Sequence, residues 1–193
     1  MSWWDSLVQI RRADAKKGTG VFISTSEVLT AAHVLTGTGG TVPIDDLTLD
    51  IRYQSLLAVP TALALLPGWT TSGSTGSDIA LVRVEARPDL GLPTVIAHPR
   101  LSKKAMVEGA GFDADNDEET MLSGNVECRG GPAGERFLYS TDFAPVPGMS
   151  GGPICAALSS GVHVAGILIR ASSTGLIGLS ITSKTLADLR SMF

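Results

Sequence analysis

Turn-forming residues divide this chain into many short segments. Its 193 residues include 22 glycines and 10 prolines, and only 5% of the residues are aromatic. Short β-rich runs such as Val21–Ser24 and Val28–Thr30 lie between these breaks, and long helical patterns are few. Many short strands separated by turns are typical of β-sandwiches and β-barrels. Because 44% of the residues are hydrophobic, a chain of this length can bury a sizeable core, so the sequence predicts an all-β fold.

The expected strands form two sets, separated by the proline-rich stretch 87–100. Residues 1–86 hold six strand-like runs and residues 101–181 hold six more. In the last segment, 182–193, Thr182 precedes apolar residues at helical spacing, which predicts a closing helix. We therefore expect one domain, 1–193, of two packed antiparallel six-stranded β-barrels joined by a linker at 87–100 and followed by a C-terminal helix.

Charge and hydropathy argue against two classes of partner. The formal net charge is −4, and no basic run is longer than a pair such as Lys103–Lys104, so no phosphate-binding surface and no nucleic-acid partner are expected. The longest apolar stretch, 56–66, is interrupted by Pro60 and is too short to cross a bilayer. The first residues, 1–5, lack the pattern of a signal peptide, which favours a soluble cytoplasmic protein with no membrane partner.

Ser150 lies in the heptad Pro-Gly-Met-Ser-Gly-Gly-Pro, residues 147–153. On a tight glycine-flanked turn a serine can hold its hydroxyl out into a cleft, while the backbone N–H groups of Gly148 and Ser150 point together as an oxyanion hole. A serine nucleophile needs a neighbouring base. Of the three histidines, His33 follows two short β-rich runs and a small-residue bend, and Asp78 opens a strand-like run that could orient the imidazole. The candidate triad is His33, Asp78 and Ser150.

Each of these assignments has a competing interpretation. Ser150 would otherwise be part of an ordinary turn between strands, and His33 a hydrogen-bonded core histidine. Asp78 would otherwise be a strand-initiating aspartate at a surface turn, and it has competitors for the catalytic role, because other aspartates also lie between His33 and Ser150 in the sequence. Among them are Asp45, Asp46 and Asp50. The remaining histidines, His98 and His163, lack a catalytic context and are interpreted as structural.

Three blocks around these residues resemble those of the trypsin-like (chymotrypsin-fold) serine peptidases, and most of all their bacterial HtrA/Deg-like branch. The blocks are Thr30–His33, Ser77–Leu81 and Gly148–Pro153, in the order of the family, and 141–142 and 175–181 are also similar to that branch. The resemblance covers nearly the whole chain. It implies a serine endopeptidase that acts on polypeptides from a cleft between the barrels through an acyl-enzyme, with no metal or organic cofactor.

The resemblance also implies a substrate pocket. Its floor would be Ala144, six positions before the nucleophile, and its walls would come from 169–171 and 176–180, so from Ile169, Arg170 and Ala171 among others. None of residues 143–149 is acidic, and a buried basic side chain without a partner is costly. Cleavage after small or medium apolar residues is therefore expected. A guanidinium of Arg170 turned into the cleft would instead favour an acidic residue.

Control of activity is expected to differ from that of secreted family members. They pair a new N-terminus with an aspartate immediately before the serine, where this chain has Met149. Activity would then be constitutive or gated by loops, by oligomerisation or by a partner, such as a regulatory protein or fused sensor domain in a defence or stress system. HtrA-like proteins usually add a PDZ domain, for which this chain has no room. The alternative function is a catalytically silent, protease-like binding module.

Two further features carry no assigned chemistry. Cys128 and Cys155 are expected to be free thiols in a reducing cytosol, with a single bridge as the alternative. The acidic stretch 113–119 alternates carboxylates like a calcium loop, but Glu118 stands where an EF-hand needs glycine and Gly124 where it needs glutamate. It is expected to be a solvated loop, with a regulatory or partner contact as the alternative.

Overall fold

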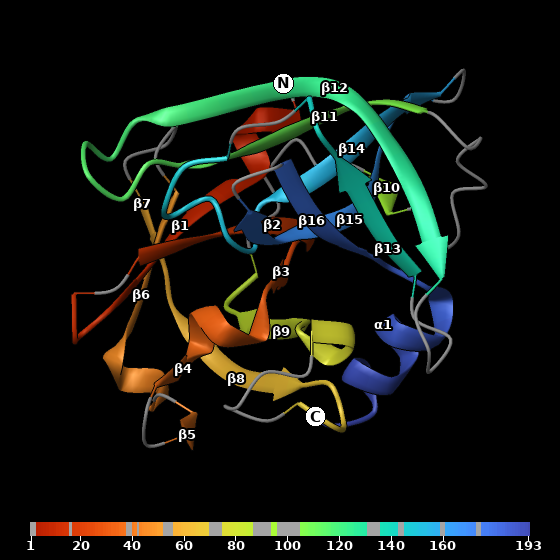
Figure 1. Cartoon of the computed structure of the whole chain (residues 1–193). Helices are drawn as coiled ribbons and strands as arrows, with labels where there is room; N and C mark the ends of the chain where they lie inside the picture. The colour runs from red at the N-terminus through yellow and green to blue at the C-terminus, as the bar shows by residue number, and fades with distance from the viewer. Residues whose placement is uncertain are drawn as a thin grey trace.

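The computed structural model describes residues 3–15, 17–37, 40–41, 43–51, 56–69, 75–86, 94–95, 105–130, 136–142, 145–158, 161–172 and 175–193. Two β-sheets pack against each other, and one α-helix ends the chain (Figure 1). The N-terminal sheet contains β1 (Leu7–Arg12), β2 (Lys17–Ser24), β3 (Glu27–Thr30), β6 (Leu47–Ile51), β7 (Leu56–Ala58), β8 (Pro60–Leu65) and β9 (Ala80–Val84). The C-terminal sheet contains β10 (Thr94–Val95), β11 (Ala105–Phe112), β12 (Glu119–Gly130), β13 (Arg136–Ser140), β14 (Pro153–Leu158), β15 (Gly161–Ser172) and β16 (Gly175–Ser180). The other elements are the hairpin of β4 (Thr36–Gly37) and β5 (Gly40–Thr41), the 3-10 turns η1 (Trp3–Ser6), η2 (Ala32–Leu35), η3 (Ile44–Asp46) and η5 (Thr75–Ser77), and α1 (Ser183–Arg190).

The C-terminal sheet closes into a barrel. Its strand order is β10-β15-β14-β11-β12-β13-β16, and β16 also pairs with β15, so six antiparallel strands form a ring. Closure leaves no free edge in that ring. The seventh strand, β10, adds to β15 in parallel, with Thr94 opposite His163. The rest of the expected linker, 87–93 and 96–100, lies outside the described residues.

The N-terminal sheet curls in the order β7-β6-β1-β2-β3-β9-β8. It has seven strands where six were expected. The two strands at its ends, β7 and β8, are consecutive in the chain and form one bent segment, in which only Val59 separates them. The bend falls at Pro60, where the β8–β9 register shifts. A proline cannot donate to a ladder and is tolerated at the first position of a strand. The expected all-β fold of two barrel-like sheets with a C-terminal helix is confirmed.

The chain returns to the N-terminal sheet through α1, which lies beside β8 and β9 in Figure 1. The Thr182 side chain accepts a hydrogen bond from the Thr185 N–H and so caps the helix at its start. Arg190, in the last turn, holds Glu27 of β3 at both carboxylate oxygens, with Nε–Oε1 at 2.9 Å and Nη2–Oε2 at 2.6 Å. These hydrogen bonds lower the pKa of Glu27 below its usual range. The last helix therefore fastens the end of the chain to the half that carries His33.

Both cysteines are free in the structure, Cys128 on β12 and Cys155 on β14. Burial raises the pKa of the Cys155 thiol, so this group stays protonated and inert. Within the described residues, no helix is long and apolar enough to cross a membrane.

Candidate active site

His33 lies on η2, the 3-10 turn that directly follows β3. Ala31 and Ala32 before it and Leu35 after it are fully buried, so the turn is anchored on both sides of the histidine. The His33 side chain itself remains 36% exposed. The small residues of the Ala-Ala-His sequence thus allow the backbone to pack tightly while the imidazole reaches the surface.

Asp78 makes two hydrogen bonds to His33. Its Oδ1 accepts from the His33 backbone N–H at 2.9 Å, and its Oδ2 lies 2.7 Å from the ring Nδ1. An ionised carboxylate can only accept hydrogen bonds, so Nδ1 carries the proton and Nε2 is left as the basic nitrogen. The Asp78 side chain is only 7% exposed, which keeps water from competing for these bonds. The two contacts fix both the tautomer and the orientation of the ring.

The sequence suggested that Asp78 begins a strand. In the structure, Asp78 lies two residues before the start of β9 and is not part of it. The adjacent Ile79 is held by a backbone hydrogen bond from Leu66 N–H to its carbonyl at 3.1 Å, so this short connection is ordered. The other candidate aspartates lie elsewhere. Asp45 and Asp46 are exposed on η3, and Asp50 lies 3.8 Å from Arg11.

Ser150 lies in a turn that is bonded to both sheets. The Ser150 carbonyl accepts from the Thr19 N–H of β2 at 2.8 Å, and the next amide, that of Gly151, donates to the Leu168 carbonyl of β15 at 2.7 Å. The turn needs glycines on both sides of Met149–Ser150, because φ is +95° at Gly148 and +85° at Gly151. The two glycines therefore allow a conformation that other residues rarely adopt.

The serine turn and the histidine turn meet at Gly151. A Cβ added there would lie 2.2 Å from the Thr19 carbonyl and the Thr30 hydroxyl, and 2.9 Å from the amide of Ala31, two residues before His33. The structure thus brings Ser150 to the end of β3 that carries the histidine. Among the described residues, no hydrogen bond joins Ser150 Oγ to the His33 ring. In enzymes without substrate such bonds are often long and tighten only in the complex.

The two amides expected to form an oxyanion hole are available. No group among the described residues accepts a hydrogen bond from the Gly148 or the Ser150 N–H. The surrounding backbone groups are used: Met149 N–H donates to Val146 and Gly152 N–H donates to the Met149 carbonyl. Met149 itself is buried and apolar, so no charge inside the loop orders it.

A cavity of about 120 Å³ opens beside the serine. Its lining comprises Pro145, Val146, Pro147, Met149, Ser150, Leu168 and Arg170. Leu168 and Arg170 of β15 line the cavity, whereas the expected wall residue Ile169, which lies at a register irregularity of the β15–β16 pair, is buried in the core. Ala144 and the side chain of Ala171 lie outside the described residues.

Thr19 is a site residue that was not anticipated from the sequence. It is fully buried, and its hydroxyl donates to the Gly148 carbonyl at 2.8 Å and accepts from the Phe112 N–H at 3.0 Å. Its side chain and its amide thus hold both ends of the Gly148–Ser150 turn. The only signal in the sequence was the position of Thr19 between two glycines, Gly18 and Gly20. In the structure, Val34 leaves no room for a Cβ at Gly18 and Val28 leaves none at Gly20.

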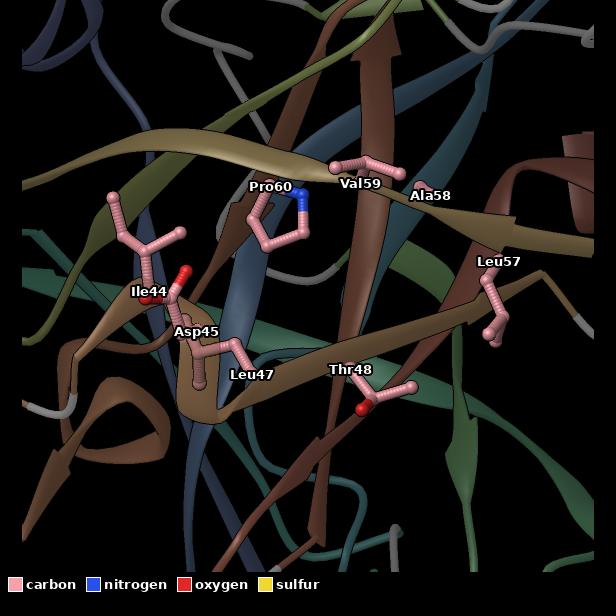
Figure 2. A pocket seen from close by; sticks show the side chains of 8 residues that line it. All are labelled: Ile44, Asp45, Leu47, Thr48, Leu57, Ala58, Val59 and Pro60. Atoms are coloured by element: carbon pink, nitrogen blue, oxygen red, sulfur yellow. The ribbon is translucent and has the colours of Figure 1, made fainter.

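A second cavity, of about 260 Å³, lies on the N-terminal sheet, and none of its described lining residues belongs to the candidate triad (Figure 2). Apolar side chains of β7 and β8 form one wall and η3 with β6 the other (Figure 2). In the described part of the chain, no group of three histidine, cysteine or acidic residues is placed to hold a metal ion.

The comparisons with known proteins agree on one family. The model of the trypsin-like peptidase domain matches residues 18–165, which is well over half of the chain. No curated protein matches the sequence. The structure of a Glu endopeptidase in complex with MPD has a TM-score of 0.78 at 16% identity and covers 98% of this chain and 90% of its own. The crystal structure of an inactive serine-to-alanine mutant of Rv3671c from M. tuberculosis H37Rv has a TM-score of 0.66 at 21% identity and covers 98% of this chain and 87% of its own. At these identities the two structures show a shared fold, and the family match shows that the chain belongs to the trypsin-like peptidases.

Proposed function

We propose that the chain hydrolyses polypeptides through a catalytic triad of His33, Asp78 and Ser150. The observation that carries this proposal is the pair of hydrogen bonds from His33 to Asp78, next to a serine turn whose Gly148 and Ser150 amides have no acceptor among the described residues. The contact with Asp78 uses Nδ1, and no group among the described residues bonds to Nε2, the nitrogen that would act as the base. A base, its orienting acid and a nucleophile at a turn are the elements of acyl transfer.

In the proposed reaction, Ser150 Oγ attacks the carbonyl carbon of the scissile bond while His33 Nε2 takes the serine proton. Asp78 stabilises the imidazolium that forms. The Gly148 and Ser150 amides donate to the oxyanion of the tetrahedral intermediate, which collapses when His33 returns the proton to the leaving amine. Water then attacks the acyl-enzyme, again with His33 as base, and releases the carboxyl product together with free Ser150.

The pocket beside Ser150 favours a small or medium apolar residue before the scissile bond. Val146, Met149 and Leu168 give it an apolar wall, and its volume of about 120 Å³ is modest. None of the described residues that line it is acidic, so a lysine or arginine of the substrate would be buried there without a partner, at a cost of several kcal/mol. Arg170 lines the same cavity, is exposed, and pairs with no carboxylate among the described residues. Its guanidinium is the group able to attract an acidic residue instead.

Cleavage of a denatured proteome digest tests both the activity and the pocket. New N-termini should form with the wild-type protein and not with Ser150→Ala, and alanine, valine or leucine should be enriched before the cut. Enrichment of lysine or arginine contradicts the pocket assignment. Because one structurally similar protein is a Glu endopeptidase, the same digest is repeated with Arg170→Ala: aspartate or glutamate enrichment that disappears in this variant assigns specificity to the guanidinium and not to the apolar wall.

We also propose a bacterial, cytoplasmic protein whose activity is gated by a regulatory partner or a fused sensor domain. The free thiols of Cys128 and Cys155 suit a reducing compartment. The resemblance to the HtrA/Deg-like branch and the similarity to a structure from M. tuberculosis favour a bacterial source. The buried, uncharged Met149 supports control from outside the serine loop and not by an ion pair within it.

A further inference from the structure

The peptide between Pro147 and Gly148 is held in one orientation by a segment outside the serine loop. The Pro147 carbonyl accepts a hydrogen bond from the Ala114 N–H at 2.8 Å. In a trans peptide the C=O and N–H groups point in opposite directions, so this bond turns the Gly148 N–H away from Ala114. Rotation of this peptide would direct a carbonyl, not a donor, at the oxyanion. The hydrogen bond from the Ala114 N–H to the Pro147 carbonyl therefore determines whether the oxyanion hole has two N–H donors or one.

Ala114 lies in the turn between β11 and β12, which is closed on itself. The Asp117 N–H donates to the Asp113 carbonyl at 2.9 Å, and the Asp113 N–H donates to the Glu118 carbonyl at 2.8 Å. The turn packs directly on the serine loop, since a Cβ at Gly148 would lie 2.7 Å from the Ala114 amide nitrogen. The acidic stretch is thus not simply a solvated loop. A shift of this turn would move the donor that holds the Pro147 carbonyl.

Lys17 of β2 holds the turn from the N-terminal sheet. Its Nζ donates to the Ala114 carbonyl at 2.9 Å and to Asp117 Oδ1 at 2.7 Å. The two side chains are only 24% and 29% exposed. The Lys17 ammonium therefore links Ala114, whose N–H binds the Pro147 carbonyl, to the Asp117 carboxylate in the same turn.

The Asp117 carboxylate has further partners on β1. Gln9, which is fully buried, donates its Nε2 to Asp117 Oδ1 at 2.7 Å, and Arg11 Nη2 lies 3.5 Å from Oδ2. The Lys17 hydrogen bond, with help from Gln9 and Arg11, lowers the pKa of Asp117. The carboxylate accordingly remains ionised at neutral and mildly acidic pH. Asp117 also has φ of +60°, a conformation that aspartate and asparagine tolerate better than most residues.

We propose that Lys17 and Asp117 are positioning residues of the oxyanion hole, which act on the Gly148 amide through the Ala114 hydrogen bond to Pro147. This inference rests on the proposed function of the Ser150 site. It assigns the ordering of the serine loop to an ion pair between the two sheets. Within the loop, the residue directly before Ser150 is the apolar Met149, which cannot form an ion pair. It also gives the acidic turn a role in catalysis without any contact with substrate.

Two variants separate this role from simple stability. Lys17→Met removes the ammonium, and Asp117→Asn removes the carboxylate charge with a residue that keeps the φ of the turn. With one peptide taken from the cleavage profile, each variant should lower kcat by about 10- to 100-fold and leave KM within about threefold. Complete loss of one oxyanion donor costs about 10²- to 10³-fold in kcat, and a misplaced donor costs less.

The double variant and an inhibitor sharpen the test. Because both side chains act through one turn, Lys17→Met with Asp117→Asn should fall no further than the worse single variant. A peptide boronic acid forms a negatively charged tetrahedral adduct with a serine, so its inhibition constant should rise in parallel with the loss of kcat. Lys184→Met and Asp188→Asn, which break the exposed pair on α1, are the matched controls and should leave kcat unchanged.

Each outcome decides the point. Folded Lys17→Met and Asp117→Asn proteins with kcat near that of wild type overturn the inference while the proposed function stands. The inference is also overturned if the variants have a lower melting temperature and a higher KM while boronate inhibition of the folded fraction is unchanged. The ion pair of Lys17 and Asp117 would then be only structural. A wild-type protein without Ser150-dependent turnover removes the proposed function itself, and this inference with it.

Discussion

Ser150→Ala and His33→Ala are each expected to lower turnover by a factor on the order of 10⁴ to 10⁶. The members of a triad act as a unit, so loss of either the nucleophile or its base removes nearly all of the acylation rate. Asp78→Asn should cost about 10⁴-fold. The amide can present its NH₂ to the ring and so stabilise the wrong tautomer of His33, although the shape of the side chain is kept.

Initial rates with a peptide from the cleavage profile measure these effects, and circular dichroism and melting temperature show that each variant is folded. Ser183→Ala, at an exposed position on α1, is the matched control and should retain full activity. Wild-type rates in a pure preparation of Ser150→Ala would remove this serine from the mechanism. Wild-type rates in Asp78→Asn would show that the two hydrogen bonds to His33 are only structural.

Gly151→Ala is expected to destabilise the fold by about 3 kcal/mol or more. The added Cβ would lie 2.2 Å from the Thr19 carbonyl and 2.2 Å from the Thr30 hydroxyl. Overpacking of this kind typically costs 1–3 kcal/mol, and the positive φ of +85° at this position adds about 1–2 kcal/mol. Relief requires the serine turn to move away from β2 and β3. The free energy of unfolding from urea titration measures the loss.

Gly161→Ala is the matched control, because this glycine also has a positive φ, +124°, but nothing within 4 Å of the added Cβ. It should lose only the conformational part, about 1–2 kcal/mol. Equal losses in the two variants would mean that the contact between the serine turn and the N-terminal sheet is looser than described.

The sequence predicted most of the fold because its signals are local. Val28–Thr30 and the glycine and proline breaks are read within a few residues, and they correspond to β3 and its turns. Two details were wrong or missed for the same reason. The strand β7 (Leu56–Ala58) was not expected, and β10 (Thr94–Val95) lies in the expected linker; at three and two residues, both are too short to show any periodicity.

The candidate site was less predictable where it depends on long-range contacts. The residues of the motif blocks could be named, and the contact between His33 and Asp78 was expected from their roles in the candidate triad. The contact of Lys17 with Asp117 spans 100 residues, and neither side chain lies in a recognisable motif. Thr19 resembled any β-branched strand residue until its hydroxyl was seen to reach Gly148. Side-chain hydrogen bonds between the two sheets leave no periodic trace in a sequence.

Labelling with a fluorophosphonate probe tests the central assignment most directly. Such a probe reacts with a serine whose hydroxyl is activated by a base and whose oxyanion is stabilised, and an ordinary surface serine stays unmodified. Mass spectrometry of the digested protein should place one adduct on Ser150, and Ser150→Ala and His33→Ala should both abolish it. An adduct on another serine, or labelling that persists in Ser150→Ala, would contradict the assignment of Ser150 as the nucleophile.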